Sequence, residues 1–223
     1  EIGYSGYPAL QQAMQEMIRN RLTSVQRLEI TSTNTPLERL LDASLEQDID
    51  IIRRTKETVS HEAFYSAADA LVQAKRVYII GAGSSLALAT FLAHYMSLVF
   101  DAVQLINATS EAQILQQIVH IGPGDALIGI SFPRYSKKAA KALRYASDRG
   151  ASVIAITDST LSPLASCAQQ VLLAKSDMVS FVDSLVGPLA LINALIVTVA
   201  IKKKDEVAKT LCDLENIGDE YGV

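Results

Sequence analysis

Two short segments place serine hydroxyls between a strand and a helix, a pattern that suits a phosphate group. The first, Gly81-Ala-Gly-Ser-Ser85, follows an apolar run at 77–80 and leads into an apolar stretch with helical character. Glycine permits a left-handed or closely approached backbone, and serines where a helix begins lie among backbone N–H groups that lack partners. The segment therefore predicts a phosphate-binding turn to which Gly83, Ser84 and Ser85 contribute.

A second turn repeats this arrangement after the apolar run 126–130. Hydroxyls, a guanidinium and the start of another helix would surround an anion there, and a guanidinium forms charge-assisted hydrogen bonds with phosphate. The candidate ligand-binding residues of this turn are Ser131, Arg134, Tyr135, Ser136 and Lys137. Two such turns in one sheet predict a pocket for a phosphorylated small molecule.

The residues of both turns also fit simpler structural roles. N-capping of a helix accounts for one of the two hydroxyls of Ser84 and Ser85, and a solvated surface accounts for Arg134. Dinucleotide binding fits poorly, because Leu86 occupies the third glycine position of the fingerprint and no acidic residue follows the second strand at 106–107. We therefore expect no NAD, FAD or other cofactor.

The elements that position these turns alternate between strand and helix. Near-continuous apolar strands separated by helices indicate a parallel sheet that is covered on both faces, an α/β fold. We expect strands at 77–80, 102–106, 126–130, 152–156 and 170–173, and helices at 62–73, 86–100, 111–119, 137–149 and 185–201, with a short helix near Leu164.

The residues before this sheet differ in character. Apolar residues at helical spacing predict an amphipathic helix over 10–22, and the Thr-, Ser- and Asn-rich stretch 29–36 is typical of a linker. A leucine and isoleucine stripe then predicts a helix over 37–59. This stripe would pack either against the domain's own sheet or against a partner helix.

Composition limits the function classes. The 223 residues carry a formal charge of −4, which argues against a broadly basic surface that coats nucleic acid. Two cysteines without CxxC or Cys/His spacing predict neither a metal site nor a disulfide framework and fit a reducing cytoplasm. The apolar run 185–201 fits a buried helix better than a membrane span. The first residue, Glu1, is expected to lie inside a longer chain.

The residues quoted above resemble those of a sugar isomerase (SIS) domain. The resemblance covers about 36–204 and rests on GAGSS at 81–85 and ISFPRYSK at 130–137, with AITDSTLSPLA at 155–165 in support. It implies a flavodoxin-like fold with a five-stranded parallel sheet. The hydroxyls that match the family's phosphate-binding serines are those of Ser85, Ser131 and Ser136, whereas proline occupies position 133, where many SIS domains have another serine.

The first residues resemble the end of the helix-turn-helix domain of RpiR/MurR-type transcription regulators. The resemblance implies a domain remnant at 1–28, the linker 29–36, a SIS domain at 37–204 and a tail at 205–223. It implies a regulator whose DNA binding responds to a sugar phosphate, with operator DNA bound through a domain that is largely absent from this chain. It also implies a homodimer or homotetramer, without a membrane partner.

A SIS enzyme such as a phosphosugar isomerase is the alternative, and it needs an acid and a base near the sugar carbons. His94, in the helix after the first turn, and Asp183, at the start of the last helix, are the available candidates. One histidine and one distant acid favour a protein without catalytic residues. Asp158, after the fourth strand, is expected to cap its loop rather than to touch a ligand.

Overall fold

The computed structural model describes residues 22–108 and 110–222. Their contacts divide them into two compact units, of which the first comprises the residues up to Asp50 together with 177–184, and the second comprises 51–176 and the residues from Leu185 onward. Most of the segment expected to be a helix-turn-helix remnant, 1–28, lies outside the described residues.

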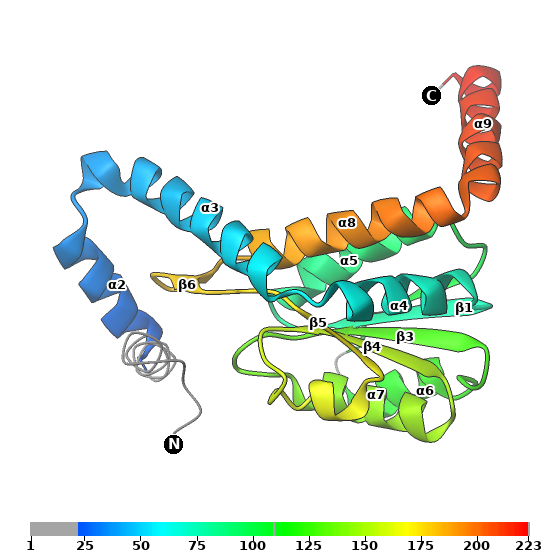
Figure 1. Cartoon of the computed structure of the whole chain (residues 1–223), viewed down its shortest axis with the longest axis horizontal. Coiled ribbons are helices and arrows are strands. Elements are labelled where there is room, and N and C mark those ends of the chain that lie inside the picture. Colours follow the sequence, from blue (N-terminus) through cyan, green and yellow to red (C-terminus); the bar gives the residue numbers. More distant parts are fainter. Residues whose placement is uncertain (1–21, 109, 223) are drawn as a thin grey trace. The chain divides into compact units, whose positions relative to one another are not determined.

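Five parallel strands form the sheet of the second unit, in the order β2-β1-β3-β4-β5 (Figure 1). The strands are β1 Arg76–Gly81, β2 Val103–Ile106, β3 Asp125–Ile130, β4 Ser152–Thr157 and β5 Gln170–Leu173. This is the strand order of the flavodoxin-like fold. It confirms the predicted fold class, and each strand lies within two residues of its predicted bounds.

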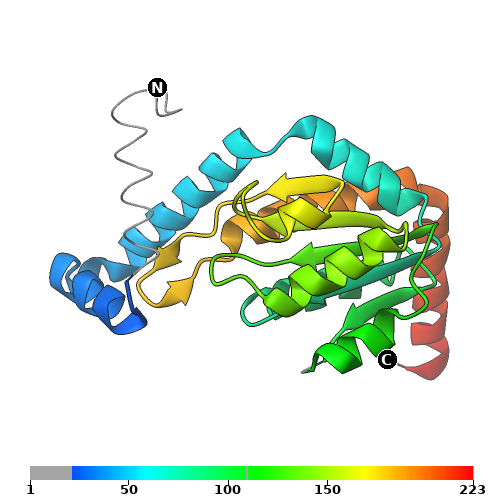
Figure 2. The ribbon, with the colours of Figure 1, turned by 90° about the horizontal axis from the view of Figure 1, so that it is seen from below.

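Helices cover both faces of this sheet, as Figures 1 and 2 show. One face carries α4 His61–Val72, α5 Ser85–Met96 and α8 Val186–Lys202, and the other carries α6 Glu111–Ile118, α7 Lys137–Asp148 and the short η2 Ala165–Cys167. Each face of the sheet has its own hydrophobic core, and alternate strand residues point to opposite cores. Val77 and Ile79 lie in the first core, and Tyr78 and Ile80 lie in the second. Burial on both faces is the physical reason for the uninterrupted apolar runs in the sequence.

The first unit contains α2 Ser24–Asn34, η1 Leu37–Arg39, most of α3 Leu40–Thr58 and a hairpin of β6 Met178–Val179 and β7 Val182–Asp183. Helix α2 occupies most of the segment 29–36 that was expected to be a linker. A capping box between Thr23 and Gln26 begins the helix. The hydroxyls of Thr31 and Thr33 donate to carbonyls one turn earlier, at 2.9 and 2.8 Å, so these residues satisfy their polar groups inside the helix.

The apolar stripe of α3 is exposed in the part of the chain that the structure describes. The exposed fractions of Leu41, Leu45, Ile49 and Ile52 run from 43% to 70%, and the helix buries only Ile51 and Thr55. The buried pair lies in the second unit. There Thr55 Oγ1 donates to the carbonyl oxygen of Ile51 at 2.8 Å and accepts the backbone N–H of Lys175 at 3.0 Å.

The segment 205–223, expected to be a tail, forms a further helix, α9 Lys204–Tyr221. No single helix among the described residues is long and apolar enough to span a membrane. Among these residues, α8 and α9 together have the length and composition of a membrane span, but the pair bends by 97° at the break between them. Helix α8 buries Leu191, Ile192 and Leu195 in the core of the second unit.

Close packing of α7 on the sheet depends on Gly129 in the middle of β3. A Cβ atom at this position would overlap Cδ1 of the fully buried Leu143 and lie 2.9 Å from its Cδ2. We expect Gly129→Ala to lower the free energy of unfolding by about 1–3 kcal/mol, as overpacking of a filled core does.

Chemical denaturation measures this loss. The matched control is Gly122→Ala, because a Cβ there would meet only the carbonyl oxygen of Arg149, at 3.9 Å. The control should change the free energy of unfolding by less than about 0.5 kcal/mol. Equal stabilities of the two variants would contradict the packing described here.

Candidate functional site

The first turn brings the start of α5 very close to the end of β1. A Cβ atom at position 81 would collide with the carbonyl oxygen of Ser85 and lie 2.9 Å from Cβ of Ala89. Gly83 has a φ angle of +61°, a left-handed conformation that favours glycine. Both glycines of the motif are thus required by the backbone. They place Ser84 at the N-cap of α5 and Ser85, which is buried, in its first turn.

The second turn is organised by its two serines. Ser136 is the N-cap of α7, and its Oγ accepts the backbone N–H of Ala139 at 3.2 Å. Ser131 Oγ accepts the backbone N–H of Ser136 at 3.0 Å. Each oxygen uses one lone pair inside the protein, so each hydroxyl proton can still be donated to an anion. Arg134, between the serines, has a φ angle of +73°, which is uncommon for a residue other than glycine.

Both turns lie at the carboxyl edge of the sheet, where the order of the strands reverses. Strands β1 and β3 are neighbours, and Gly81 pairs with Ile130. Helix α5 leaves β1 toward one face of the sheet, and α7 leaves β3 toward the other. Because the helices diverge to opposite faces, the two turns lie at the position where ligands of open α/β sheets bind. The N-termini of both helices direct partial positive charge to the edge.

A side-chain hydrogen bond joins the second turn to the loop after β4. The hydroxyl of Tyr135 donates to Asp158 Oδ1 at 2.8 Å, and Thr157 Oγ1 donates to the same oxygen at 3.3 Å. Burial, followed by the hydrogen bond to Asp158, raises the pKa of Tyr135 well above its usual value of 10, so the phenol stays a proton donor at neutral pH. Asp158 therefore orders the loops at this edge.

The predicted site residues differ in exposure. Ser85 and Ser131 are buried, and Tyr135 and Ser136 are half-buried. The exposed predicted residues are Gly83, Ser84, Arg134 and Lys137, the last of which is the first residue of α7. Buried hydroxyls therefore lie at the base of the two turns, and charged side chains lie at the surface around them.

The two residues considered for acid and base chemistry lie elsewhere. His94 is exposed in the last turn of α5, about 13 Å along the helix from Ser85 at 1.5 Å per residue. Asp183 belongs to the hairpin strand β7, so its expected place at the start of the last helix is wrong. Among the described residues, no group of three or more His, Cys, Asp and Glu side chains is placed to hold a metal ion.

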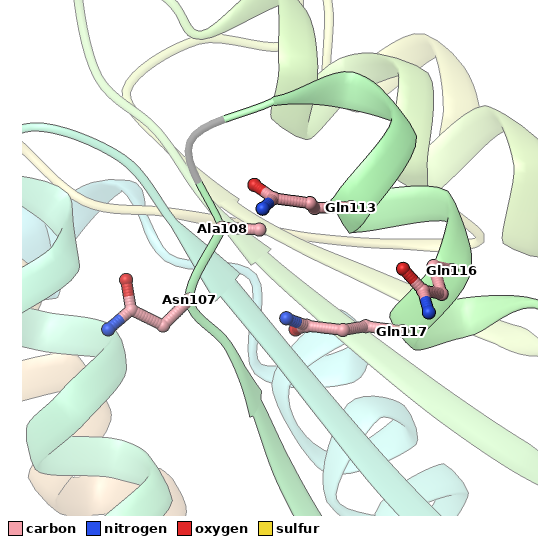
Figure 3. A pocket seen from close by; sticks show the side chains of 5 residues that line it. All are labelled: Asn107, Ala108, Gln113, Gln116 and Gln117. Atoms are coloured by element: carbon pink, nitrogen blue, oxygen red, sulfur yellow. The ribbon is translucent and has the colours of Figure 1, made fainter.

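The structure also has a cavity of about 590 Å³ that the motifs did not reveal. It is lined by Asn107, Ala108, Gln113, Gln116 and Gln117. Gln113 and Gln117 extend from α6 toward the segment that follows β2 (Figure 3). The Oε1 atom of Gln117 is buried and has no hydrogen-bond partner. Three glutamines at positions i, i+3 and i+4 of a helix after a strand are the sequence signal for this lining.

The hydrogen bond between Tyr135 and Asp158 is expected to stabilise the folded protein. We expect Tyr135→Phe to lower the free energy of unfolding by about 1–2 kcal/mol at pH 7, because the carboxylate loses a donor. The raised pKa fixes the sign: this contribution is fully present below pH 10 and is lost as the pH rises from there through the folded-state pKa. Tyr65→Phe is the control, since Tyr65 is 54% exposed. Equal stabilities of the two variants would contradict this assignment.

Two relatives are described as uncharacterised HTH-type transcriptional regulators. One, from Clostridium perfringens, is 24% identical over 166 residues, which are 74% of this chain and 58% of the relative. The other, from Caldanaerobacter subterraneus subsp. tengcongensis, is 28% identical over 166 residues, which are 72% of this chain and 57% of the relative. The chain thus matches less than two thirds of the length of either relative.

Solved structures share the fold. The sugar isomerase domain of an RpiR transcription factor from Sphaerobacter thermophilus has a TM-score of 0.75 and 29% identity, covering 80% of this chain and 99% of that one. The Vibrio vulnificus NanR protein, solved in complex with ManNAc-6P, has a TM-score of 0.69 and 19% identity, covering 96% and 77%. The phosphoheptose isomerase GmhA of Neisseria gonorrhoeae has a TM-score of 0.63 and 19% identity, covering 74% and 98%.

The family model of the SIS domain matches residues 70–198, which are more than half of the chain. The matched segment contains all five strands and both serine-bearing turns. The order of the strands, the glycine-dependent start of α5 and the serines at the N-termini of α5 and α7 agree with this match. The chain belongs to the SIS domain family.

Proposed function

We propose that this chain is the sensor part of a bacterial transcription regulator, in which the SIS domain binds a sugar phosphate that modulates operator binding. The observation that carries the proposal is the convergence of two serine-bearing helix N-termini at the reversal of the strand order. Relatives described as HTH-type regulators and the likeness to an RpiR transcription factor support the regulatory role.

The phosphate of the ligand is proposed to lie between the two turns. Its oxygens would accept hydrogen bonds from the hydroxyls of Ser85, Ser131 and Ser136 and from backbone N–H groups at the starts of α5 and α7. Arg134 and Lys137, exposed at the rim, would supply positive charge. The NanR structure with bound ManNAc-6P supports a sugar phosphate as the class of ligand.

The amide-lined cavity is proposed to receive the uncharged end of the ligand. Asn107 follows Ile106, which pairs with Ile80 of β1, so the cavity begins one strand away from the first turn. Its lining is neutral, and amides both donate and accept hydrogen bonds, which suits sugar hydroxyls. The unpartnered oxygen of Gln117 would gain a donor from such a hydroxyl.

Helix α3 is the proposed link between sensing and DNA binding. Its residues up to Asp50 belong to one unit and those from Ile51 to the other. The second part is fixed where Thr55 accepts the N–H of Lys175, and a Cβ at Gly187 would lie 2.6 Å from Thr55 Oγ1. A ligand that binds two arrangements of this helix with different affinity would shift the population between them.

An isomerase is the second candidate function, because phosphoheptose isomerase shares the fold. The geometry favours it less. His94 lies at the opposite end of α5 from the first turn, and Asp158 is already the acceptor of the Tyr135 hydroxyl. NMR of phosphosugars incubated with the protein should show no interconversion, and turnover that is lost in His94→Ala would favour the enzyme.

Substitution of the serines tests the phosphate site. We expect Ser85→Ala and Ser131→Ala each to weaken the binding of a sugar phosphate by about 1.5–3 kcal/mol, roughly 10- to 150-fold, as expected for hydrogen bonds to a charged group. A thermal-shift screen of sugar phosphates identifies the probe, and calorimetry then measures its dissociation constant.

Ser152→Ala is the matched control, because Ser152 is an exposed serine at the opposite end of β4 and should leave the dissociation constant unchanged. The free sugar should bind at least tenfold more weakly than its phosphate. Equal affinity for the sugar and its phosphate, or equal effects of the three serine variants on the dissociation constant, would contradict the proposed phosphate site.

The regulatory step is tested in the full-length protein. The sugar phosphate should change operator affinity, and operator DNA should change sugar phosphate affinity by the same factor, because the coupling free energy is reciprocal. Electrophoretic mobility shifts and calorimetry measure the two factors, with Ser85→Ala as the uncoupled control. Operator affinity that is indifferent to every ligand of the Ser85 site would eliminate the regulator hypothesis.

A further inference from the structure

A line of hydrogen bonds runs from the second turn across the carboxyl ends of β4 and β5. The hydroxyl of Tyr135 donates to Asp158 Oδ1 at 2.8 Å, and Thr157 Oγ1 donates to the same oxygen at 3.3 Å. Thr157 is the last residue of β4, and its carbonyl oxygen accepts the backbone N–H of Ala174, the residue after β5, at 2.9 Å. The second turn is thus bonded to the segment that leaves the neighbouring strand.

The same line continues into helix α3. Lys175, the next residue, donates its backbone N–H to Thr55 Oγ1 at 3.0 Å. The Thr55 hydroxyl donates in turn to the carbonyl oxygen of Ile51 at 2.8 Å. Ile51 is the residue at which α3 enters the second unit, and every residue of the line belongs to that unit. The line therefore joins the candidate phosphate site to the helix that belongs to both units.

Most of the line is shielded from water. Ile51, Thr157 and Ala174 are fully buried, and Thr55 is 4% exposed. A buried group that loses its partner cannot bond to water instead, so it either follows the displaced partner or stays unpaired at a cost in free energy. A shift of the second turn is therefore coupled to these groups rather than absorbed by solvent.

Close packing holds Thr55 at the end of the line. Gly187, in the first turn of α8, lies against it. A Cβ atom at this glycine would lie 2.5 Å from the carbonyl oxygen of Lys175, 2.6 Å from Thr55 Oγ1 and 3.0 Å from Cγ2 of Ile51. A side chain packed at this density cannot move independently of its neighbours. The start of α8 therefore keeps Thr55 against the segment after β5.

The other end of the line adjoins a strained residue. Arg134, directly before Tyr135, has a φ angle of +73°, and a residue other than glycine keeps such a conformation only where the surrounding structure holds it. The bond from Tyr135 to Asp158 and the bond from the Ser136 N–H to Ser131 Oγ lie on its C-terminal side. An anion that contacts the two serines would change the free energy of this strained turn. The turn is therefore an element whose equilibrium a bound phosphate can bias.

We propose that this line of hydrogen bonds carries the response to a bound phosphate from the second turn to α3, with Thr55 as the positioning residue that receives it. The inference rests on the proposed function, because it concerns the regulation of the same site. A phosphate between the two turns would favour the arrangement in which Tyr135 stays bonded to Asp158. The segment after β5 would then hold α3 at Thr55, and loss of the phosphate would loosen this hold.

The first test asks whether the two ends of the line are connected when no ligand is bound. We expect Tyr135→Phe to shift the NMR signal of the Lys175 amide proton, because phenylalanine keeps the ring and removes only the hydroxyl that holds Asp158. Tyr145→Phe is the matched control, since the Tyr145 hydroxyl donates to the carbonyl oxygen of Val119 at 3.4 Å, away from the line. It should leave the Lys175 signal in place.

The second test uses inorganic phosphate as the probe. Sodium phosphate is titrated into the labelled chain, with sodium chloride of equal ionic strength as the reference. The amide signals of Ser136 and of residues 51–55 should move with the same apparent dissociation constant. In Thr55→Val the Ser136 signal should still move, whereas the signals of 51–55 should lose their response.

Two further variants separate the Thr55 hydroxyl from the general stability of α3. Thr55→Ser keeps the hydroxyl and should preserve the response of residues 51–55. Thr58→Val removes a hydroxyl from the same helix, one that donates to the carbonyl oxygen of Arg54 at 2.9 Å, and it should preserve the response as well. Circular dichroism and thermal unfolding show whether each variant is folded, and the Tyr135→Phe measurement does not depend on the Thr55 variants.

The full-length protein tests the regulatory consequence. With the sugar phosphate identified by the thermal-shift screen, the coupling factor between sugar phosphate and operator, typically about 5- to 150-fold, should fall to about 1 in Thr55→Val. It should persist in Thr55→Ser and Thr58→Val. The dissociation constant of the sugar phosphate, measured without DNA, should stay within about twofold in all three variants, because Thr55 lies outside the proposed phosphate site.

The outcomes distinguish the line from the site itself. A Ser136 signal that ignores phosphate would overturn the proposed phosphate site and this inference with it. A Ser136 signal that responds while residues 51–55 do not would overturn the line alone. The same conclusion would follow if Tyr135→Phe left the Lys175 amide unchanged, or if Thr55→Val kept the coupling factor of the wild type.

Discussion

The reversal of the strand order between β1 and β3 is the constraint on which the site depends. Because α5 and α7 begin on neighbouring strands and cross to opposite faces of the sheet, the N-termini of both helices lie side by side at its carboxyl edge. Glycine at position 81 is required for α5 to begin so close to the sheet. The position of the two serine turns therefore follows from the strand order.

The second turn is more elaborate than the first. Its serines are bonded to the backbone of their own loop, Arg134 adopts a left-handed conformation, and Tyr135 is tied to Asp158. These interactions fix a loop that has proline at position 133, where a further hydroxyl would otherwise be available. The first turn depends on the close approach of the backbone at Gly81 and on the left-handed conformation of Gly83.

Helix α3 belongs to both units of the chain. It enters the second unit at Ile51, where Thr55 accepts the backbone N–H of Lys175. A regulator needs a way to transmit a ligand-dependent change to its DNA-binding domains. Helix α3 is the proposed route for this change, because it belongs to both units.

Periodicity and local chemistry determined much of this protein from its sequence. The uninterrupted apolar runs predicted five buried parallel strands, and serines between a strand and a helix located both turns. Only the tertiary structure shows which residues that are distant in the sequence lie near one another, and which that are close in the sequence lie apart. His94 is near Ser85 in sequence but lies at the other end of a helix, and Asp183 belongs to a two-residue hairpin strand. Residues 29–34 are helical, and the hydroxyls of Thr31 and Thr33 donate to carbonyls one turn earlier. The link between Tyr135 and Asp158 spans 23 residues, so only folding could bring these groups together.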